Sequence, residues 1–396
     1  MKGMTLCAPD GARCHLSVPA LGLALFRNCT CVLLLALILA APACAPKKWT
    51  LRSEQPVIGL QWPYQPNMAK ATFAHSLTGL VSDRNSSEVV SAIVFGTDQE
   101  DRNTFLLPVA VSVGADGRLA VADMGRRRVH LYLPAQQRYV QLSGSAQEQL
   151  ASPVGLAFDE ELRLYVADSS GKIFAFGPEG APLSTWRQVG AERFQRPTGI
   201  TYSPDKKLLY VVDTLANKVH ALKTNGELAF SFGERGEKLG AFNFPTHIFR
   251  SAAGELYVTD ALNFRIAVFD EIGTALATFG HHGDGSGDLA MPKGVVVDKD
   301  GIVYVVDGLF DNVQLFNRRG DFLLTLGRRG TDFGEFWLPS GAFISGNGEL
   351  YVCDTYNRRV QVFQIAEGYA NDDRRGDAER GDAEGKIDAE MRRLDG

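Results

Sequence analysis

Six aspartates recur along the chain at a nearly constant interval, and a ring of carboxylates is one way in which a protein holds a metal ion. The intervals between them are 45, 45, 47, 47 and 47 residues. Each aspartate ends an apolar segment and precedes a turn, where a carboxylate accepts the backbone N–H groups of the turn. Because the same residue recurs in every unit, we interpret its role as structural. The six are Asp123, Asp168, Asp213, Asp260, Asp307 and Asp354.

The histidines offer a second chemistry, which is that of a metal-dependent hydrolase or lyase. Their strongest constellation is His247 with His281 and His282, near Asp284 and Asp288. Imidazole and carboxylate groups are ligands that zinc accepts. The site requires that these residues converge in space, and the sequence does not establish that they do.

The aspartates belong to a repeat, which the aligned segments LYVVDTLANKVHAL (209–222) and YVCDTYNRRVQVF (351–363) illustrate. Each unit predicts four short strands, because runs of Val, Ile, Leu, Phe and Tyr alternate with turn residues. A proline lies about fifteen residues before each aspartate, at Pro108, Pro153, Pro197, Pro245, Pro292 and Pro339. Six such units predict an all-β fold, a six-bladed β-propeller of four-stranded antiparallel blades. His130 and His220 fall at matching positions on third strands, where we expect them at the surface.

The ring is expected to close through an N-terminal strand. The last unit ends at FQIAEGYANDD without a fourth strand, whereas KATFAHSLTG (70–79) resembles the outer strand GELAFSFG (226–233). An unpaired sheet edge invites aggregation. We therefore predict that residues 70–78 complete the last blade beside residues 359–364.

The residue after each blade proline begins an innermost strand, so its side chain is expected near the mouth of the central channel. Lys293 is the only charged residue in this set, and His247 lies beside Thr246. One interpretation is that Lys293 extends into solvent. The other is a small anion site formed by Lys293, Thr246, Thr198 and Ser340, because a partly dehydrated lysine favours a negative partner. The full set is Val109, Val154, Thr198, Thr246, Lys293 and Ser340.

The turns between second and third strands define a face that carries arginine and aromatic residues, the types enriched in binding hot spots. The loops that lead into each blade, such as ERGEKLGAFNFP and RRGTDFGEFWLP, belong to the same face. We predict a protein-binding surface there. The alternative is a set of solvated turns and inter-blade packing. The residues are Arg126, Arg127, Lys218, Phe264, Arg265, Phe310, Tyr356 and Arg358.

The N-terminal 43 residues have the pattern of a signal peptide, with a short apolar run in CVLLLALILAAPAC (31–44). We expect Cys44 to be the first mature residue and to carry a lipid anchor in a bacterial outer membrane lipoprotein; simple secretion to the periplasm or cell surface is the alternative. Residues 44–56 are expected to form a tether, residues 57–366 the propeller with one helix at about 86–96, and residues 367–396 a charged disordered tail.

Composition limits the partners further. The net charge of −5 provides no basic footprint for nucleic acid. Four of the six cysteines lie in the signal segment and Cys44 would be acylated, which leaves Cys353 as a small buried residue without a disulfide partner. We expect a monomer apart from its partner.

The motifs PTGI, YVVDT and NRRVQVF resemble those of bacterial six-bladed propellers of the NHL-repeat type, over about residues 57–365. IGLQWP and GEFWLPSG further resemble an exported subgroup, and this resemblance implies an envelope partner such as multihaem cytochromes. Related propellers hold calcium or zinc on their inner strands. Here those strands contain no carboxylate and only His247, so we expect no cofactor and a non-catalytic scaffold, with the metal-dependent hydrolase or lyase as the alternative.

Overall fold

The structure is a computed structural model that describes residues 47–83 and 103–366. The signal peptide, Cys44, the helix expected at 86–96 and the tail 367–396 lie outside the described residues. Within the described part, no helix is both long and apolar enough to cross a membrane.

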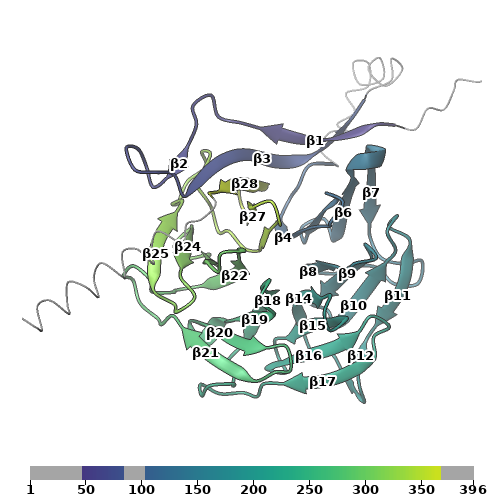
Figure 1. Ribbon diagram of the computed structural model, residues 1–396. Helices are drawn as coiled ribbons and strands as arrows, with labels where there is room; N and C mark the ends of the chain where they lie inside the picture. The colour runs from purple at the N-terminus through teal and green to yellow at the C-terminus, as the bar shows by residue number, and fades with distance from the viewer. Residues whose placement is uncertain (1–46, 84–102, 367–396) are drawn as a thin grey trace, which may run out of the picture. The chain divides into compact units, whose positions relative to one another are not determined.

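Six four-stranded antiparallel blades surround a common axis, as the sequence predicts (Figure 1). Blade 1 consists of β4 (Pro108–Val113), β5 (Leu119–Asp123), β6 (Arg128–Leu133) and β7 (Arg138–Leu142). Blade 2 consists of β8 (Pro153–Phe158), β9 (Leu164–Asp168), β10 (Lys172–Phe176) and β11 (Pro182–Trp186). Blade 3 consists of β14 (Pro197–Ser203), β15 (Leu208–Asp213), β16 (Lys218–Lys223) and β17 (Leu228–Phe232).

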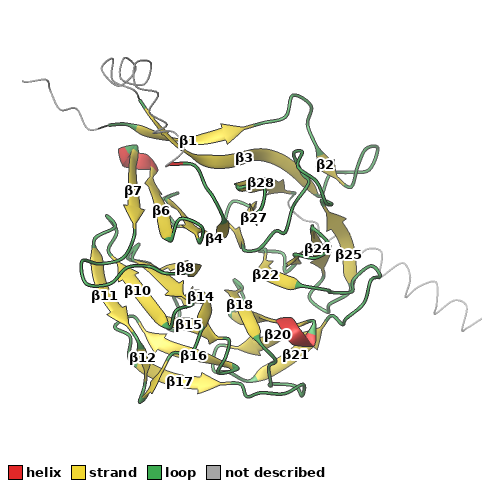
Figure 2. Cartoon of the chain, turned by 180° about the vertical axis from the view of Figure 1, so that it is seen from behind, coloured by secondary structure: helices red, strands yellow, loops and turns green. Residues whose placement is uncertain are grey.

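Blades 4 and 5 continue the order with β18 (Pro245–Arg250), β19 (Glu255–Asp260), β20 (Arg265–Asp270) and β21 (Ala275–Phe279), then β22 (Pro292–Val297), β23 (Val303–Asp307), β24 (Asn312–Phe316) and β25 (Phe322–Leu326). Blade 6 contains β26 (Ala342–Ile344), β27 (Glu349–Asp354) and β28 (Arg359–Ile365). The shorter elements are β12 (Gln188–Val189), β13 (Glu192–Arg193) and the 3-10 turns η2 (Pro134–Gln136) and η3 (Ala261–Asn263). Figure 2 shows how little of the described chain is helical.

The ring closes as predicted. β3 (Ala71–Ser82) pairs antiparallel with β28, from Leu77 opposite Val360 to Ala71 opposite Ile365. The outer strand of the last blade therefore comes from the N-terminal end of the domain, which ties the two ends together.

The expected tether at 44–56 is wrong for most of its described part. β1 (Trp49–Glu54) pairs antiparallel with β3 as a further strand on the outside of blade 6, and β2 (Gln61–Trp62) pairs with the other end of β3. The backbone N–H of Trp49 donates to Gln137 in blade 1, and the two rings of Trp49 and Tyr139 meet edge to face. The alternation of Trp49 and Leu51 with polar residues is a strand pattern, so the propeller sheet begins at Trp49 instead of residue 57.

The core lies between the blades, because each second strand is buried on both faces. β9, β15 and β23 are apolar almost throughout and end in a buried aspartate. The innermost strands pack closely where glycine follows the blade proline. A Cβ at Gly199 would lie 2.8 Å from the Cα of His247 in the next blade. Cys353 is fully buried in β27 with a free thiol, and burial raises its pKa.

Candidate functional site

The six repeat aspartates fasten the segment that leads into each innermost strand. Asp123 accepts the backbone N–H groups of Leu106 and Leu107 at 2.7 and 3.0 Å, and that of Arg126 in the following turn at 3.0 Å. The carboxylates of the other blades accept equivalent N–H groups. The structural interpretation of the aspartates is therefore confirmed.

Arg265 is part of the same fastening, so its assignment to a free binding face is wrong. Its guanidinium donates to Asp260 and to the backbone carbonyls of Glu237 and Ala241, and the side chain is only 13% exposed. These carbonyls belong to the loop that connects blade 3 to blade 4. Arg359 makes the equivalent contacts in blade 6, with Asp354 at 2.7 Å and the carbonyls of Asp332 and Glu335.

The other predicted face residues differ in their contacts and exposure. Arg126 is also structural, because its Nε donates to the carbonyl of Thr104 at 2.7 Å. Phe264 packs on the ring of His282 at 4.4 Å between centroids. Lys218 and Phe310 are half-buried, whereas Arg127, Tyr356 and Arg358 are exposed. Of the eight predicted residues, only Arg127, Tyr356 and Arg358 are exposed on this face.

Exposed apolar side chains, most of them outside the predicted set, also lie on this face. The second residue after the aspartate is a large, exposed apolar residue in four consecutive blades. These residues, with the neighbouring Trp337, form what we call the apolar arc: Leu215 (50% exposed), Leu262 (53%), Leu309 (60%), Tyr356 (51%) and Trp337 (40%).

The position of the arc follows from the turn itself. The N–H of Leu309 donates to Asp307, so the carboxylate fixes the backbone while the side chain stays in solvent. Trp337 joins through Tyr356, whose ring lies 5.7 Å away. In blades 1 and 2 the same position holds Gly125 and Ser170, so the arc spans blades 3 to 6. In the sequence, the residues of the arc other than Trp337 could be found by their position, two residues after each aspartate.

The channel mouth, meaning the axial end where the innermost strands begin, differs from the predicted anion site in one member. Thr355 donates to the carbonyl of Pro108, and the Ser340 hydroxyl is occupied by Thr355 and the carbonyl of Val109. The hydroxyl protons of Ser340 and Thr355 are both donated to acceptors within the protein. Ser340 therefore has no proton left for a ligand, and its inclusion is wrong.

The metal constellation expected from the histidines does not assemble. His281 pairs with Asp288 at 2.6 Å on the surface, whereas His282 lies on the ring of Phe264. His247 is in a different environment beside Thr246, within the innermost strand. Across residues 47–83 and 103–366, no group of three or more His, Cys, Asp or Glu residues could hold a metal ion.

His130 and His220 are buried, which corrects the expectation that they lie at the surface. Nδ1 of His130 meets the hydroxyl of Tyr139 at 2.6 Å, and Nε2 lies 3.5 Å from Asp123. Burial alone would raise the pKa of Asp123, but the hydrogen bonds from His130 and from the backbone outweigh it and hold that pKa below its ordinary value. Both third-strand faces are covered by neighbouring blades, so a polar residue there needs internal partners.

His220 lies between Asp213 and Ser231. Serine, histidine and aspartate are the residue types of a catalytic triad. The Nδ1 of His220 meets Ser231 Oγ at 2.8 Å, but its Nε2 lies 3.8 Å from Asp213. The cross-strand position of Ser231 carries a hydroxyl in four other blades: Thr185, Thr278, Thr325 and Ser76. A hydroxyl repeated around the ring indicates a structural role.

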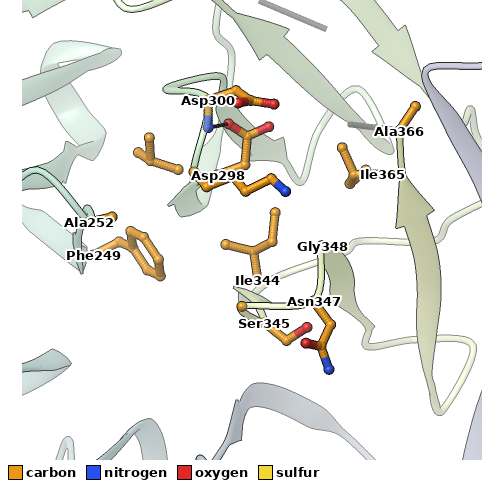
Figure 3. Close-up of a pocket in the computed structure, with 13 residues that line it drawn as sticks. Phe249, Ala252, Asp298, Asp300, Ile344, Ser345, Asn347, Gly348, Ile365 and Ala366 are labelled. Carbon is orange, nitrogen blue, oxygen red and sulfur yellow. Dashed lines mark hydrogen bonds between the residues drawn. The ribbon is translucent and has the colours of Figure 1, made fainter. Parts of the chain in front are cut away.

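A pocket of about 170 Å³ lies at the opposite face, among the turns between first and second strands of blades 4 to 6. Figure 3 shows Phe249, Ile344 and Ile365 around it. The buried carboxylate at its wall, Asp298, already accepts from the N–H of Ile302 and the hydroxyl of Tyr304. The pocket offers an apolar surface.

Two family models match parts of the chain. The arylesterase model matches residues 183–266, and the NHL repeat model matches residues 336–363, within blade 6. No curated protein matches the sequence.

Solved propellers share the fold at low sequence identity. A streptogramin B lyase structure is 10% identical with a TM-score of 0.53, covering 81% of this chain and 98% of its own. A virginiamycin B lyase from Staphylococcus aureus is 13% identical (TM-score 0.50, 66% and 95% covered). A gluconolactonase from Xanthomonas campestris is 17% identical (TM-score 0.51, 66% and 87% covered). Similarity at this level concerns the fold alone.

Proposed function

We propose that this six-bladed β-propeller, whose sixth blade matches the NHL repeat, is a non-catalytic scaffold that binds a protein partner on its turn-bearing face. The observation that carries the proposal is the apolar arc. Isolated exposed leucines are common on protein surfaces, but apolar side chains gathered on one face mark interaction sites. Here the residues recur at one position of four neighbouring blades.

The energetics favour a partner of apolar character. Fully burying a leucine from water contributes about 1.5–3 kcal/mol, so each half-exposed leucine of the arc still offers about 1 kcal/mol. Tyr356 and Trp337 add aromatic anchors, and the exposed Arg358 and Arg127 supply charge at the margin. An apolar centre with a charged rim is the usual anatomy of a protein interface.

The scaffold holds this surface rigidly. Arg265 and Arg359 bind the connecting loops through several backbone carbonyls each, and Asp307 fixes the turn that carries Leu309. A surface ordered before binding loses less conformational entropy when the partner docks. The fold therefore supports a binding platform without requiring a moving part.

The location of this scaffold is proposed from the N-terminal sequence. The apolar segment ending at Cys44 supports export and a lipid anchor, which would keep the propeller at the cell envelope. The resemblance to exported NHL-type propellers supports an envelope complex, such as one containing multihaem cytochromes, as the partner class.

The test is affinity capture with a matched control. The triple variant Leu215→Ser, Leu262→Ser, Leu309→Ser should lose at least tenfold in partner yield from an envelope fraction. The control is Leu183→Ser, Ile272→Ser, Leu276→Ser, which alters side chains of similar exposure away from this face. Equal partner yields from both variants would refute the binding face.

A hydrolase or lyase is the second candidate, and the arylesterase match over residues 183–266 favours it. Metal analysis of protein purified without chelator, combined with hydrolysis of a simple aryl ester, distinguishes the two. Bound stoichiometric metal together with turnover that a chelator abolishes would replace the scaffold proposal. The absence of turnover under these conditions would remove the second candidate.

A further inference from the structure

Two cationic residues flank blade 4 at the channel mouth, Arg196 from blade 3 and Lys293 from blade 5. Arg196 precedes the blade proline of blade 3, and its guanidinium carbon lies 5.5 Å from the ring centroid of Phe244, the equivalent residue of blade 4. Lys293 follows the proline of blade 5, and its backbone carbonyl accepts a hydrogen bond of 2.7 Å from Thr259 of blade 4. Between them lie Thr246 and His247, at the start of β18.

These cations lack a carboxylate partner. Within residues 47–83 and 103–366, neither Arg196 nor Lys293 forms an ion pair, although their own charges act on each other. Burial lowers the pKa of Lys293, the Asp307 charge opposes this shift in part, and the Arg196 charge adds to it. Asp307 forms no ion pair with Lys293, and its two oxygens accept backbone N–H groups of the connecting loop and the turn.

The polar groups between the cations can add hydrogen bonds. Thr198 and Thr214 hydroxyls meet at 2.8 Å, which uses one of their two protons and leaves the other. Burial, and after it the nearby Lys293 charge, lowers the pKa of His247 to about 3, so at neutral pH its ring is uncharged with a single N–H. Thr246 Oγ1 lies 3.3 Å from that ring. A partly buried lysine near an exposed arginine, with threonine hydroxyls beside them, forms a setting that a bound anion stabilises.

We propose that Arg196 and Lys293 bind an oxyanion, a carboxylate or phosphate group, above Thr246 and His247 at the channel mouth. Arginine provides a planar pair of donors that matches an oxyanion, and lysine adds a compact charge. The oxyanion can come from two sources. One is a free small molecule, and the other is an acidic side chain of a docked protein. The apolar arc lies on the same face over blades 3 to 6, and Arg196 is exposed, so either source can reach the cations.

The probes are inorganic phosphate and acetate, titrated into the full chain by calorimetry at fixed ionic strength with chloride as the reference. Lys293→Met and Arg196→Met should each weaken binding tenfold or more. The control Arg358→Met removes an exposed cation of the same face and should change affinity less than twofold. Thermal unfolding checks that each variant is folded; Lys293→Met should not lower the melting temperature.

Absence of phosphate and acetate binding by the unaltered protein overturns the proposal, as does binding that both methionine variants retain. The source is resolved by partner capture. If Lys293→Met also weakens capture, the oxyanion belongs to the partner; if only phosphate affinity changes, it is a free anion. The serine variants of the arc should leave phosphate affinity unchanged, so failure of the protein-binding face and failure of the anion site are separate results.

Discussion

Nη2 of Arg265 donates a hydrogen bond of 2.9 Å to the backbone carbonyl of Ala241, 24 residues earlier in the chain. This contact joins the turn of blade 4 to the loop that enters the same blade. Arg359 repeats it with Glu335 in blade 6. The arginine shared by YVTDALNFRIAVF (257–269) and YVCDTYNRRVQVF (351–363) therefore fastens a loop, and two of the predicted binding arginines, Arg126 and Arg265, are structural.

Replacing Arg265 tests this fastener. Arg265→Ala leaves Asp260 buried without its cation and frees three loop carbonyls, so we expect a loss of about 2–4 kcal/mol in the free energy of unfolding. Arg358→Ala, at the exposed neighbouring turn of blade 6, should cost less than about 0.5 kcal/mol. Urea denaturation measures both. Equal stability of the two variants would mean that the contacts of Arg265 carry no net energy.

Ring closure is a second measurable feature. Leu77 of β3 is almost fully buried opposite Val360, so Leu77→Ala should cost about 2–4 kcal/mol through lost burial and the cavity left behind. Thr72 lies on the same strand but is exposed, and Thr72→Ala should cost less than about 0.5 kcal/mol. Denaturation midpoints that shift equally would show that β3 is not the strand that completes blade 6.

The environment of His247 predicts a pH dependence. Burial and Lys293 lower its folded-state pKa to about 3, whereas the unfolded chain has the ordinary value of about 6.5. Between these values the unfolded state binds one more proton, so stability falls as the pH falls through the window. His247→Gln should flatten the slope of unfolding free energy against pH by up to about 1.4 kcal/mol per unit. His281→Gln, at the surface, should leave the slope unchanged; a slope unaffected by His247→Gln would contradict the partly buried, neutral ring.

The period of the repeat was sufficient to predict the fold, because the aspartates and prolines mark the strand ends in every blade. The closing strand was also predictable, since KATFAHSLTG has the pattern of an outer strand and blade 6 lacked one. β1 was missed, because its pairing with β3 across an intervening loop leaves only a short alternation around Trp49 and Leu51.

The candidate site was harder to predict, because exposure depends on the neighbouring blade. Arg265 and Arg358 occupy adjacent positions of the repeat, yet one is buried by a connecting loop and the other is not. His130 was placed at the surface, but Asp123 and Tyr139 provide internal partners that only the folded sheet brings together. The apolar arc was visible only after the turn positions had been aligned on the aspartates.

The central claim is that the apolar arc contacts a protein partner, and site-specific photocrosslinking tests it most directly. Benzoylphenylalanine is placed at Leu309 in the arc or at Leu276 on the outer strand of blade 4, two positions that are 60% and 50% exposed. After irradiation in the producing cells, Leu309 should yield a discrete crosslinked product containing one partner protein, and Leu276 should not. Crosslinking of that partner at Leu276 alone, or equally at both positions, would contradict the account.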